Sequence, residues 1–549
     1  MSRADCILTG GRVWKGKGLG FAEAVAIADG KVLAVGSTAQ ILPLAGPRTV
    51  RVDLEGRLAT PGLYDAHMHL HMFGLAMTEV DLRPQVVATL AQLLDALRAK
   101  AAVTPKGAWI TGRGYDNFKL DVGRHPFREE LDMACPDHPV YVVRTDGHLG
   151  VANSLALEMA GISEDTPSPE GGLIERRNGR LTGLLAETGR QQLTDILPKA
   201  DVAQLVDAIE RAGKVLLSHG ITSCMEAAIG IQGGWPEMEA YLEAKRSGRL
   251  PLRVYGTIMG DKTQSILDQA TEAGMITGMG DEMFRHGPVK IFTDGSASGR
   301  TAAMTWAYKG GDPDDRGILC IPDQAELSAM VLAAHRAGYQ MAIHAIGDAA
   351  IDEVLNAYEA ALADTPAPDR RHRIEHCGWL RPDQLQRMID LRVLPVPQPS
   401  FMYWFGELYC AVADMDKVEG SHPYRDWINA GLEPSASTDC PVTEVDPRPV
   451  LYNLVTRKTA KGLVLGDAQR LSMEEALHAY TYASAYGSHE ENLKGRLIPG
   501  QLGDVAVWDR DLFRVAPEDI LTAHCDLAIL GGRIVHERAG QASRARADA

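Results

Sequence analysis

The chain has 549 residues, 45% hydrophobic and 23% charged, enough for one large enzyme domain with one or two accessory domains. Its net charge of −16 argues against nucleic acid and anionic membrane as main partners, and no apolar run approaches the ~18 to 20 residues that would cross a bilayer. Eight cysteines without a CxxC pair, and an amino terminus without a secretory signal, favour a reducing, cytoplasmic location.

The two ends of the chain share one sequence pattern. Residues 6–37, "CILTGGRVWKGKGLGFAEAVAIADGKVLAVGS", alternate apolar and polar residues between Gly-Gly, Asp-Gly and Gly-Ser turns. This pattern is typical of short antiparallel strands. Near the other end, "CDLAILGGRIVHE" repeats the order of apolar strand, Gly-Gly and apolar strand. We therefore predict a small β-sandwich domain built from residues 1–58 and 490–540.

The middle of the chain alternates between strand-like and helix-like segments. The strand-like runs "GPVKIFTD", "YQMAIHAIGD" and "HRIEHCG" are followed by the helix-like runs "DQAELSAMVLAAHRAG", "AAIDEVLNAYEAALAD" and "RPDQLQRMIDLR". Strict alternation predicts a parallel sheet covered by helices, and the length suits an α/β (β/α)₈ TIM-like barrel over residues 59–489. Residues from about 82 to 201 are rich in Gly, Pro and Asn and fit this alternation badly. We predict that they form a long insertion after strand one that shapes substrate access.

Three histidines occupy alternate positions in "PGLYDAHMHLHMFG", residues 61–74. In a strand, His67, His69 and His71 would point to the same face, so all three could reach one metal ion. Two imidazoles at the carboxyl end of a barrel strand can hold a divalent ion such as zinc. His-X-His also occurs by chance in long chains, so this run alone leaves the ligand role open.

Later strand ends add further candidate ligands. His344 ends the strand-like run "MAIHAIGD", and His376 ends "HRIEHCG" about one βα unit later. A lone histidine at a strand end is more often structural, but four at three strand ends of one barrel favour a metal site. Asp439 in "EPSASTDCPVTEVDP" could contact the metal and take a proton from its bound water. The alternative is an aspartate that forms a turn before Cys440 and Pro441.

Lys290 lies inside the apolar run V-K-I-F, where an unpaired ammonium would be costly to bury. Desolvation lowers the pKa of a lysine, and a neutral amine can add carbon dioxide to give a carbamate, an oxygen ligand able to bridge two cations. The alternative is an ordinary lysine that extends to solvent or pairs with Asp294.

The ordered motifs "DAHMHL", "VKIFTDG", "AIHAIGD", "RIEHCG" and "STDCPV" resemble the amidohydrolase superfamily. They are most similar to amidohydrolase family 3, which includes N-substituted formamide deformylases. The resemblance extends over nearly the whole chain through "TGGRVW", "DGKVLAVG", "DGHLGVANSLAL", "HGITSCMEA" and "LIPGQLGDVAVWD". Several ordered motifs together are far more specific than any one of them.

The resemblance implies roles for individual residues. It places the metal ligands at His67, His69, Lys290 (carboxylated in many members), His344, His376 and Asp439. It also implies that three residues face the substrate pocket: His148 in "DGH", Tyr115 in "GRGYDN" and Arg300 in "SGRTA". Their alternatives are a capped loop histidine, a core tyrosine and a surface arginine. His71 matches no family ligand, so we expect it at the pocket rim or as a plain loop histidine.

The implied activity is metal-dependent hydrolysis of a non-peptide C–N bond in a small amide, N-substituted formamide, cyclic amide or carbamate. One or two divalent ions, with zinc expected, would activate water, Asp439 would transfer its proton to the leaving nitrogen, and His148 would help to polarise the carbonyl. A homodimer is common among similar proteins.

The first alternative to a hydrolase is a non-catalytic ligand-binding or regulatory barrel. Its sequence mark would be a lost metal ligand, and none is lost. The second is a deaminase, which usually has a glutamate beside the strand-five histidine and no strand-four lysine. Residues 345–348 read "AIGD" instead.

Overall fold

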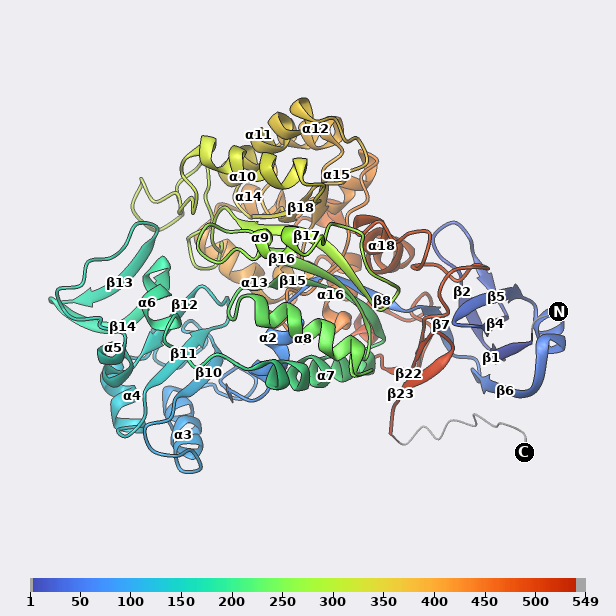
Figure 1. Cartoon of the computed structure of the whole chain (residues 1–549), viewed down its shortest axis with the longest axis horizontal. Helices are drawn as coiled ribbons and strands as arrows, with labels where there is room; N and C mark the ends of the chain where they lie inside the picture. The colour runs from blue at the N-terminus through green and yellow to red at the C-terminus, as the bar shows by residue number, and fades with distance from the viewer. Residues whose placement is uncertain (1–2, 540–549) are drawn as a thin grey trace.

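The structure is a computed structural model that describes residues 3–539. Its centre is a sheet of seven parallel strands in the order β20-β19-β18-β17-β16-β15-β8 (Figure 1). In chain order they are β8 (Leu63–Met68), β15 (Ile221–Ile229), β16 (Arg253–Met259), β17 (Phe284–Phe292), β18 (Met341–Ala345), β19 (Arg373–His376) and β20 (Leu394–Val396). Almost every residue in these strands is buried, as expected for parallel strands covered on both faces.

Residues 435–440 occupy the place of the expected eighth strand without forming a regular one. The Asp439 N–H donates to the carbonyl of His67 at 2.8 Å, and the His69 N–H donates to the carbonyl of Cys440 at 2.7 Å. On the other side, the Ser437 hydroxyl donates to the carbonyl of Pro397 at 3.0 Å. The segment therefore nearly closes the sheet, and the predicted TIM-like α/β fold is confirmed with seven regular strands among the described residues.

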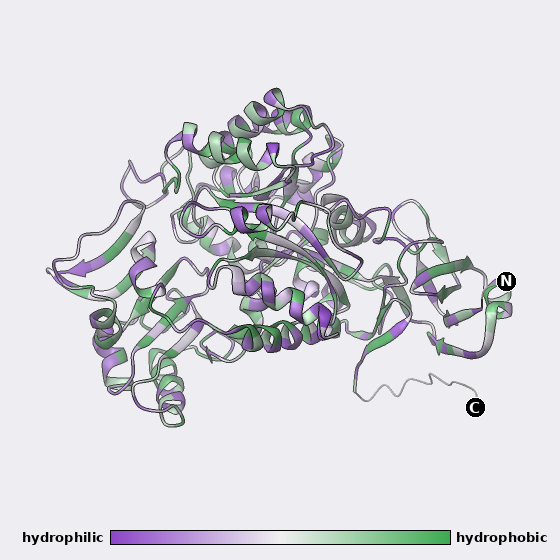
Figure 2. Cartoon of the chain, in the orientation of Figure 1, coloured by the Kyte–Doolittle hydropathy of each residue, from purple (hydrophilic) through white to green (hydrophobic). Residues whose placement is uncertain are grey.

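Amphipathic helices cover the outside of the barrel. The principal ones are α7 (Val202–Ser218), α8 (Trp235–Arg246), α10 (Gln324–Arg336), α11 (Asp348–Asp364), α12 (Pro382–Leu391) and α16 (Pro447–Thr456). Helix α7 begins at Asp201, whose side chain accepts the N–H of Gln204, and its apolar face enters the main hydrophobic core. Hydrophilic and hydrophobic residues alternate along these helices (Figure 2).

Two further sheets are built from the ends of the chain. One has the order β5-β4-β1-β6 and the other β23-β22-β21-β7-β2-β3. Their strands are β1 (Ala4–Thr9), β2 (Arg12–Trp14), β3 (Phe21–Ala22), β4 (Ala24–Ala28), β5 (Lys31–Gly36), β6 (Ala45–Asp53), β7 (Leu58–Pro61), β21 (Val505–Trp508), β22 (Cys525–Leu530) and β23 (Arg533–Glu537). Side chains of both sheets share one buried cluster, which includes Val25 and Val507. A separate β-sandwich domain stays a prediction, and its predicted last residue, 540, lies outside the described residues.

The predicted insertion contains a sheet of its own, in the order β13-β14-β12-β11-β10-β9. Its strands are β9 (Val80–Asp81), β10 (Ile110–Tyr115), β11 (Val140–Arg144), β12 (Leu149–Ala152), β13 (Gly172–Arg177) and β14 (Arg180–Glu187). Along β11, Val140 and Val142 enter one hydrophobic cluster while Tyr141 and Val143 enter another. Both faces of this sheet are therefore covered, and the unit lies across the barrel from the terminal sheets (Figure 1).

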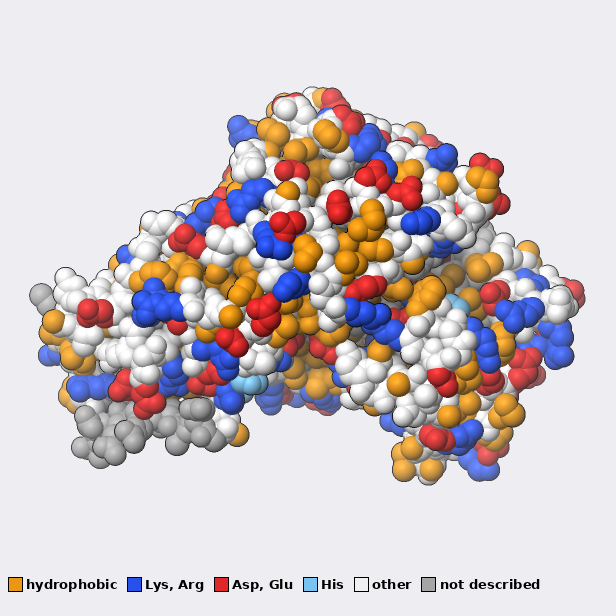
Figure 3. All heavy atoms as spheres, turned by 180° about the vertical axis from the view of Figure 1, so that it is seen from behind, with side chains coloured by type: hydrophobic (Ala, Val, Ile, Leu, Met, Phe, Trp, Pro, Cys, Tyr) orange, Lys and Arg blue, Asp and Glu red, His pale blue; other side chains and the backbone are white. Residues whose placement is uncertain are grey.

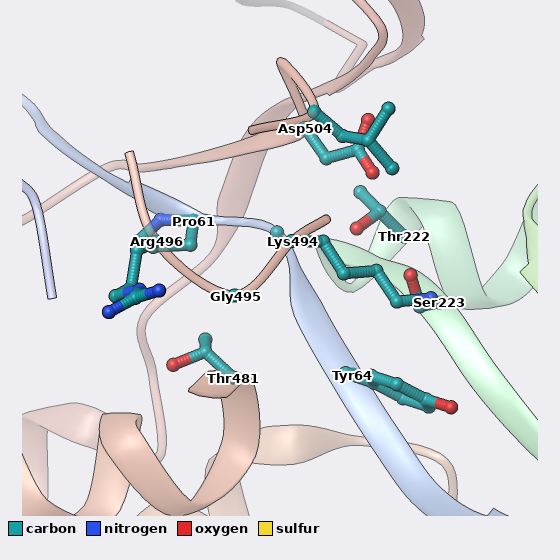
Figure 4. Close-up of a pocket in the computed structure, with 11 residues that line it drawn as sticks. Pro61, Tyr64, Thr222, Ser223, Thr481, Lys494, Gly495, Arg496 and Asp504 are labelled. Atoms are coloured by element: carbon teal, nitrogen blue, oxygen red, sulfur yellow. The ribbon is translucent and has the colours of Figure 1, made fainter. Parts of the chain in front are cut away.

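A small pocket at the amino-terminal end of the barrel is lined in part by the charged residues Lys494, Arg496 and Asp504 (Figure 4). The buried Lys494 Nζ lies 2.8 Å from Glu490 and 4.4 Å from the ring centroid of Tyr64 on β8. Arg253 of β16 pairs with Asp504 at 2.7 Å. The remaining cavity, about 10 Å³, has room for about one water molecule. This network fixes the segment before β21 to the barrel and closes the end opposite the candidate site.

Acidic and basic side chains are interspersed with hydrophobic ones on the face shown in Figure 3. None of the helices within residues 3–539 is both long and apolar enough to span a bilayer.

Candidate metal and active site

A cavity of about 1930 Å³ lies at the carboxyl ends of the barrel strands, between the barrel and the insertion. Its lining includes all of the metal ligands predicted from sequence: His67, His69, Lys290, His344, His376 and Asp439. Carboxyl ends of parallel barrel strands meet at one face, which is how residues more than 370 positions apart in the sequence come together here.

The closest group comprises His67, His376 and Asp439, which are all buried. One possible ligand atom from each lies within 4.8 Å of the others. Asp439 Oδ1 lies 3.4 Å from His67 Nε2 and 3.3 Å from His69 Nε2. The ring of His344 lies 4.3 Å from that of His376 between centroids.

The histidine rings are held from behind by hydrogen-bond acceptors. His67 donates from Nδ1 to Glu375, His376 donates from Nδ1 to the Gln398 side-chain oxygen at 2.6 Å, and His344 donates from Nε2 to a main-chain carbonyl at 3.1 Å. Each bond fixes the ring tautomer and leaves the other nitrogen free for a metal ion.

Four buried polar atoms at this site fit a divalent metal ion. They have no hydrogen-bond partner within residues 3–539: His67 Nε2, Lys290 Nζ, His344 Nδ1 and Asp439 Oδ1. An unpaired buried donor or acceptor costs about 1–3 kcal/mol, and a metal ion held by the histidines and Asp439 would remove this cost at their atoms. Imidazole nitrogen and carboxylate oxygen are ligands that zinc accepts.

The Lys290 side chain is fully buried, and burial lowers the pKa of its amine. The ion pair with Asp294 that was the alternative for Lys290 is not formed. Asp294 instead accepts the N–H groups of Ile346, Gly347 and Ala303, at 3.0, 2.8 and 3.0 Å. Burial of Lys290 thus favours the neutral form of its amine, against the nearby carboxylates of Glu375 and Asp439.

Asp439 is a charged carboxylate. Burial by itself would raise its pKa, but the contacts with His67 and His69 outweigh burial and hold the pKa well below the usual range. Its backbone φ is +56°, and that of His376 is +71°, a region that non-glycine residues rarely occupy. Backbone strain of this kind costs about 1–3 kcal/mol and concentrates at functional sites.

His148 lies on the insertion side of the same cavity. Its Nδ1 donates to Glu187 at 2.9 Å, which leaves Nε2 for a substrate. Burial would lower the pKa of His148, but the Glu187 carboxylate outweighs it and raises the pKa to about 9. At neutral pH the ring is therefore a cation and a hydrogen-bond donor.

Tyr115 and Arg300, both predicted pocket residues, do not reach the cavity. The strand register shifts between Arg113 and Tyr115, at Gly114 with φ +95°, so Arg113 lines the cavity while Tyr115 turns into the insertion core. There the Tyr115 hydroxyl bonds to a ring nitrogen of His125 at 2.8 Å. Arg300 donates to a main-chain carbonyl in its own loop instead.

His71 lies behind the site and not at its rim. Strand β8 ends at Met68 and helix α2 (Leu70–Ala76) begins, so the alternation of faces stops before His71. The buried ring lies between Glu226 and Glu237, with nitrogen–oxygen distances of 3.1 and 3.2 Å. Burial would lower the pKa of His71, but the two carboxylates raise it to about 10.

Sequence reasoning missed the residues that accept hydrogen bonds from the histidines of the site. Glu375, which binds His67 and also pairs with Arg373 at 2.7 Å, stands directly before His376 in the fully buried strand β19. A charged residue inside a predicted barrel strand, directly beside a predicted metal ligand, could have indicated this role. Glu187 and Gln398 lie in segments with no comparable pattern.

Comparison with known proteins assigns the family. A sequence model described as the amidohydrolase family matches residues 51–536. Protein LONG AFTER FAR-RED 3 of Arabidopsis thaliana is 31% identical, over 92% of this chain and 88% of its own length. The N-substituted formamide deformylase of Arthrobacter pascens is 28% identical, over 94% of this chain and 96% of its own. A crystal structure described as an uncharacterized metal-dependent hydrolase from Pyrococcus horikoshii is 29% identical, with a TM-score of 0.76, over 93% of this chain and 99% of that one. The predicted family is thus confirmed: this chain belongs to the amidohydrolase family and is a hydrolase.

Proposed function

We propose that this hydrolase cleaves a C–N bond outside ordinary peptides, in a small amide, N-substituted formamide, cyclic amide or carbamate. The observation that carries the proposal is the convergence of unpaired, buried His67 Nε2, His344 Nδ1 and Asp439 Oδ1 at one cavity. Similarity to a formamide deformylase over almost the full length of both chains supports the same bond class.

The metal would be zinc, as one ion or two. The ligands we assign are His67, His69, His344, His376 and Asp439, and Lys290 would bridge two ions after its neutral amine adds carbon dioxide and releases a proton. A bound divalent ion supplies Lewis acidity and lowers the pKa of water towards ~7.

Two of the chain's own side chains would act on the substrate. Asp439 takes a proton from the attacking water as the C–O bond forms, and delivers it to nitrogen as the C–N bond breaks. His148 donates a hydrogen bond from Nε2 to the carbonyl oxygen as negative charge develops there. An amide or formamide gives a carboxylic acid and an amine, a cyclic amide opens to a single molecule that carries both groups, and a carbamate gives a carbonic acid monoester and an amine.

The cavity is larger than the ~300–1,000 Å³ usual for small-molecule sites, so a substituted amide would fit. Apolar side chains form part of its wall: Ile231, Ile266, Met304, Ile318, Leu319 and Ile321. An apolar substituent on the amide is therefore supported. The cytoplasmic location and the homodimer remain predictions.

The test is metal analysis of the purified protein combined with a screen of N-substituted amides for amine release. We expect bound zinc and metal-dependent turnover. Asp439→Asn should keep the metal and lose turnover by about 10²- to 10⁴-fold, the usual range for a proton-transfer group. Asp414→Asn, at an exposed carboxylate, is the matched control. Near wild-type turnover in Asp439→Asn would refute its assigned role.

Two other results would support the alternatives. A protein without metal, inactive after zinc, iron or manganese is added, would favour a non-catalytic binding barrel. Release of ammonia from amino heterocycles, with N-substituted amides untouched, would identify a deaminase.

A further inference from the structure

Glu187 ends strand β14 in an unusual backbone conformation. Its φ is +48° and its ψ −128°, a region that glycine occupies far more readily than glutamate. The Glu187 N–H donates to the carbonyl of His148 at 3.1 Å. The backbone therefore brings this carboxylate beside His148 despite the conformational strain.

The side chain of Glu187 fixes the His148 ring. One carboxylate oxygen, Oε2, accepts the proton of His148 Nδ1 at 2.9 Å, and both side chains are largely buried. The His148 backbone is held separately, since its N–H donates to Asp146 at 3.1 Å. With Nδ1 engaged, Nε2 is the ring nitrogen left to face the cavity.

The same carboxylate also contacts the loop that follows β17. Glu187 Oε1 lies so close to Gly295 that a Cβ there would come within 2.8 Å of it. The carbonyl of Gly295 accepts the Nε2 proton of His344 at 3.1 Å, and the His148 and His344 rings lie 6.0 Å apart between centroids. The Glu187 carboxylate of the insertion thus lies against the loop whose Gly295 carbonyl accepts a proton from the His344 ring.

We propose that Glu187 is a positioning residue that holds the His148 imidazole with Nε2–H directed at the carbonyl oxygen of the substrate. This inference rests on the proposed amide hydrolysis. It makes the active site composite, because the barrel supplies the metal ligands and the proton acceptor, while two strand ends of the insertion supply the oxyanion donor and its support.

The kinetic test is a double-mutant cycle between Glu187 and His148. Glu187→Ala should lower kcat about 10- to 100-fold, the usual effect of losing such a support, with KM changed by less than about threefold and bound metal unchanged. In the His148→Ala background the same substitution should have no further effect. An equal loss of kcat in both backgrounds would overturn the proposal. Glu187→Gln keeps the side-chain volume and an acceptor oxygen, so it should recover part of the kcat that Glu187→Ala loses. This variant separates the loss of the hydrogen bond from misfolding.

A second measurement needs neither substrate nor metal. In metal-free protein with ¹³C-labelled histidine rings, the His148 resonance is the one missing from the His148→Ala spectrum. It should shift in Glu187→Ala and stay in place in Glu170→Ala, which removes another carboxylate that lines the same cavity. An unmoved resonance in Glu187→Ala would overturn the proposal. If the wild-type protein cleaves no amide, the proposed function fails, while this spectrum still reports whether Glu187 holds the ring.

Discussion

Replacing His71 by alanine should destabilise the protein by several kcal/mol and leave its metal in place. The His71 ring is fully buried between the carboxylates of Glu226 and Glu237, which are 0% and 2% exposed. Removing the cation leaves two buried negative charges, and breaking a buried pair in this way costs about 3–5 kcal/mol. The pKa of about 10 agrees, because against an unfolded value of 6.5 it corresponds to about 3 kcal/mol at pH 7.5.

The loss is measurable as a fall in Tm by scanning calorimetry at pH 7.5. An unfolding entropy of about 2.1 cal/mol/K per residue, over the full chain, converts the loss into a Tm lower by about 3 to 4 °C. His478→Ala is the matched control. Its partner Glu433 lies 2.8 Å away, but their side chains are 15% and 36% exposed, so we expect a loss below about 1 kcal/mol.

The dependence on pH gives the sign of the effect. The folded pKa of His71 is raised, so its contribution is complete below about pH 6.5 and is lost as pH rises through about 10. The wild-type Tm should therefore approach that of His71→Ala in this alkaline range. The reasoning is refuted if the two proteins have equal Tm at pH 7.5, or if His71→Ala loses metal as His67→Ala should.

Three further predictions concern the metal and the barrel floor. Glu375→Gln should weaken zinc affinity about 10- to 100-fold, because His67 loses its charged acceptor; chelator competition measures this, and unchanged affinity would contradict it. If Lys290 bridges two ions, Lys290→Ala should reduce the bound metal from two ions to one or none; equal metal content in mutant and wild type would exclude a bridge. Asp504→Ala leaves Arg253 buried without its partner and should cost about 3–5 kcal/mol in calorimetry. It should leave kcat unchanged, because the pair lies at the far end of the barrel, and a lost kcat with intact Tm would contradict this.

The barrel was predictable because its strands and helices differ in period. Strands buried on both faces, such as β18 with its sequence MAIHA, are mainly apolar, while the helices between them are amphipathic. The segment at residues 435–440 looked like an eighth strand, but its backbone turns at Asp439 and no regular ladder forms. The sheet inside the insertion was not predicted, because residues typical of turns dominate the composition there and hide strands such as β11.

The metal-binding candidates were visible because their residue types are rare at strand ends. Counting alternate positions misled only for His71, because strand β8 ends at Met68 and helix α2 begins before His71. The pocket role that the resemblance implied for Tyr115 failed because a register shift at Gly114 turns this side chain into the insertion core. The acceptors behind the ligands depend on contacts between distant segments, as between His67 and Glu375, and such contacts leave no local periodicity.

Strand β7 can pair with β21 only late in synthesis, because the two strands lie near opposite ends of the chain. Leu58–Pro61 leaves the ribosome early, but its partner Val505–Trp508 follows only after about 450 more residues. At translation rates of about 5–20 residues per second, this edge of β7 stays without its partner strand for roughly 20–90 s. One residue separates β7 from the first barrel strand, so the open edge lies beside the part of the chain that carries His67 and His69. A nascent or truncated chain without β21 therefore exposes a strand edge open to aggregation and to chaperone binding.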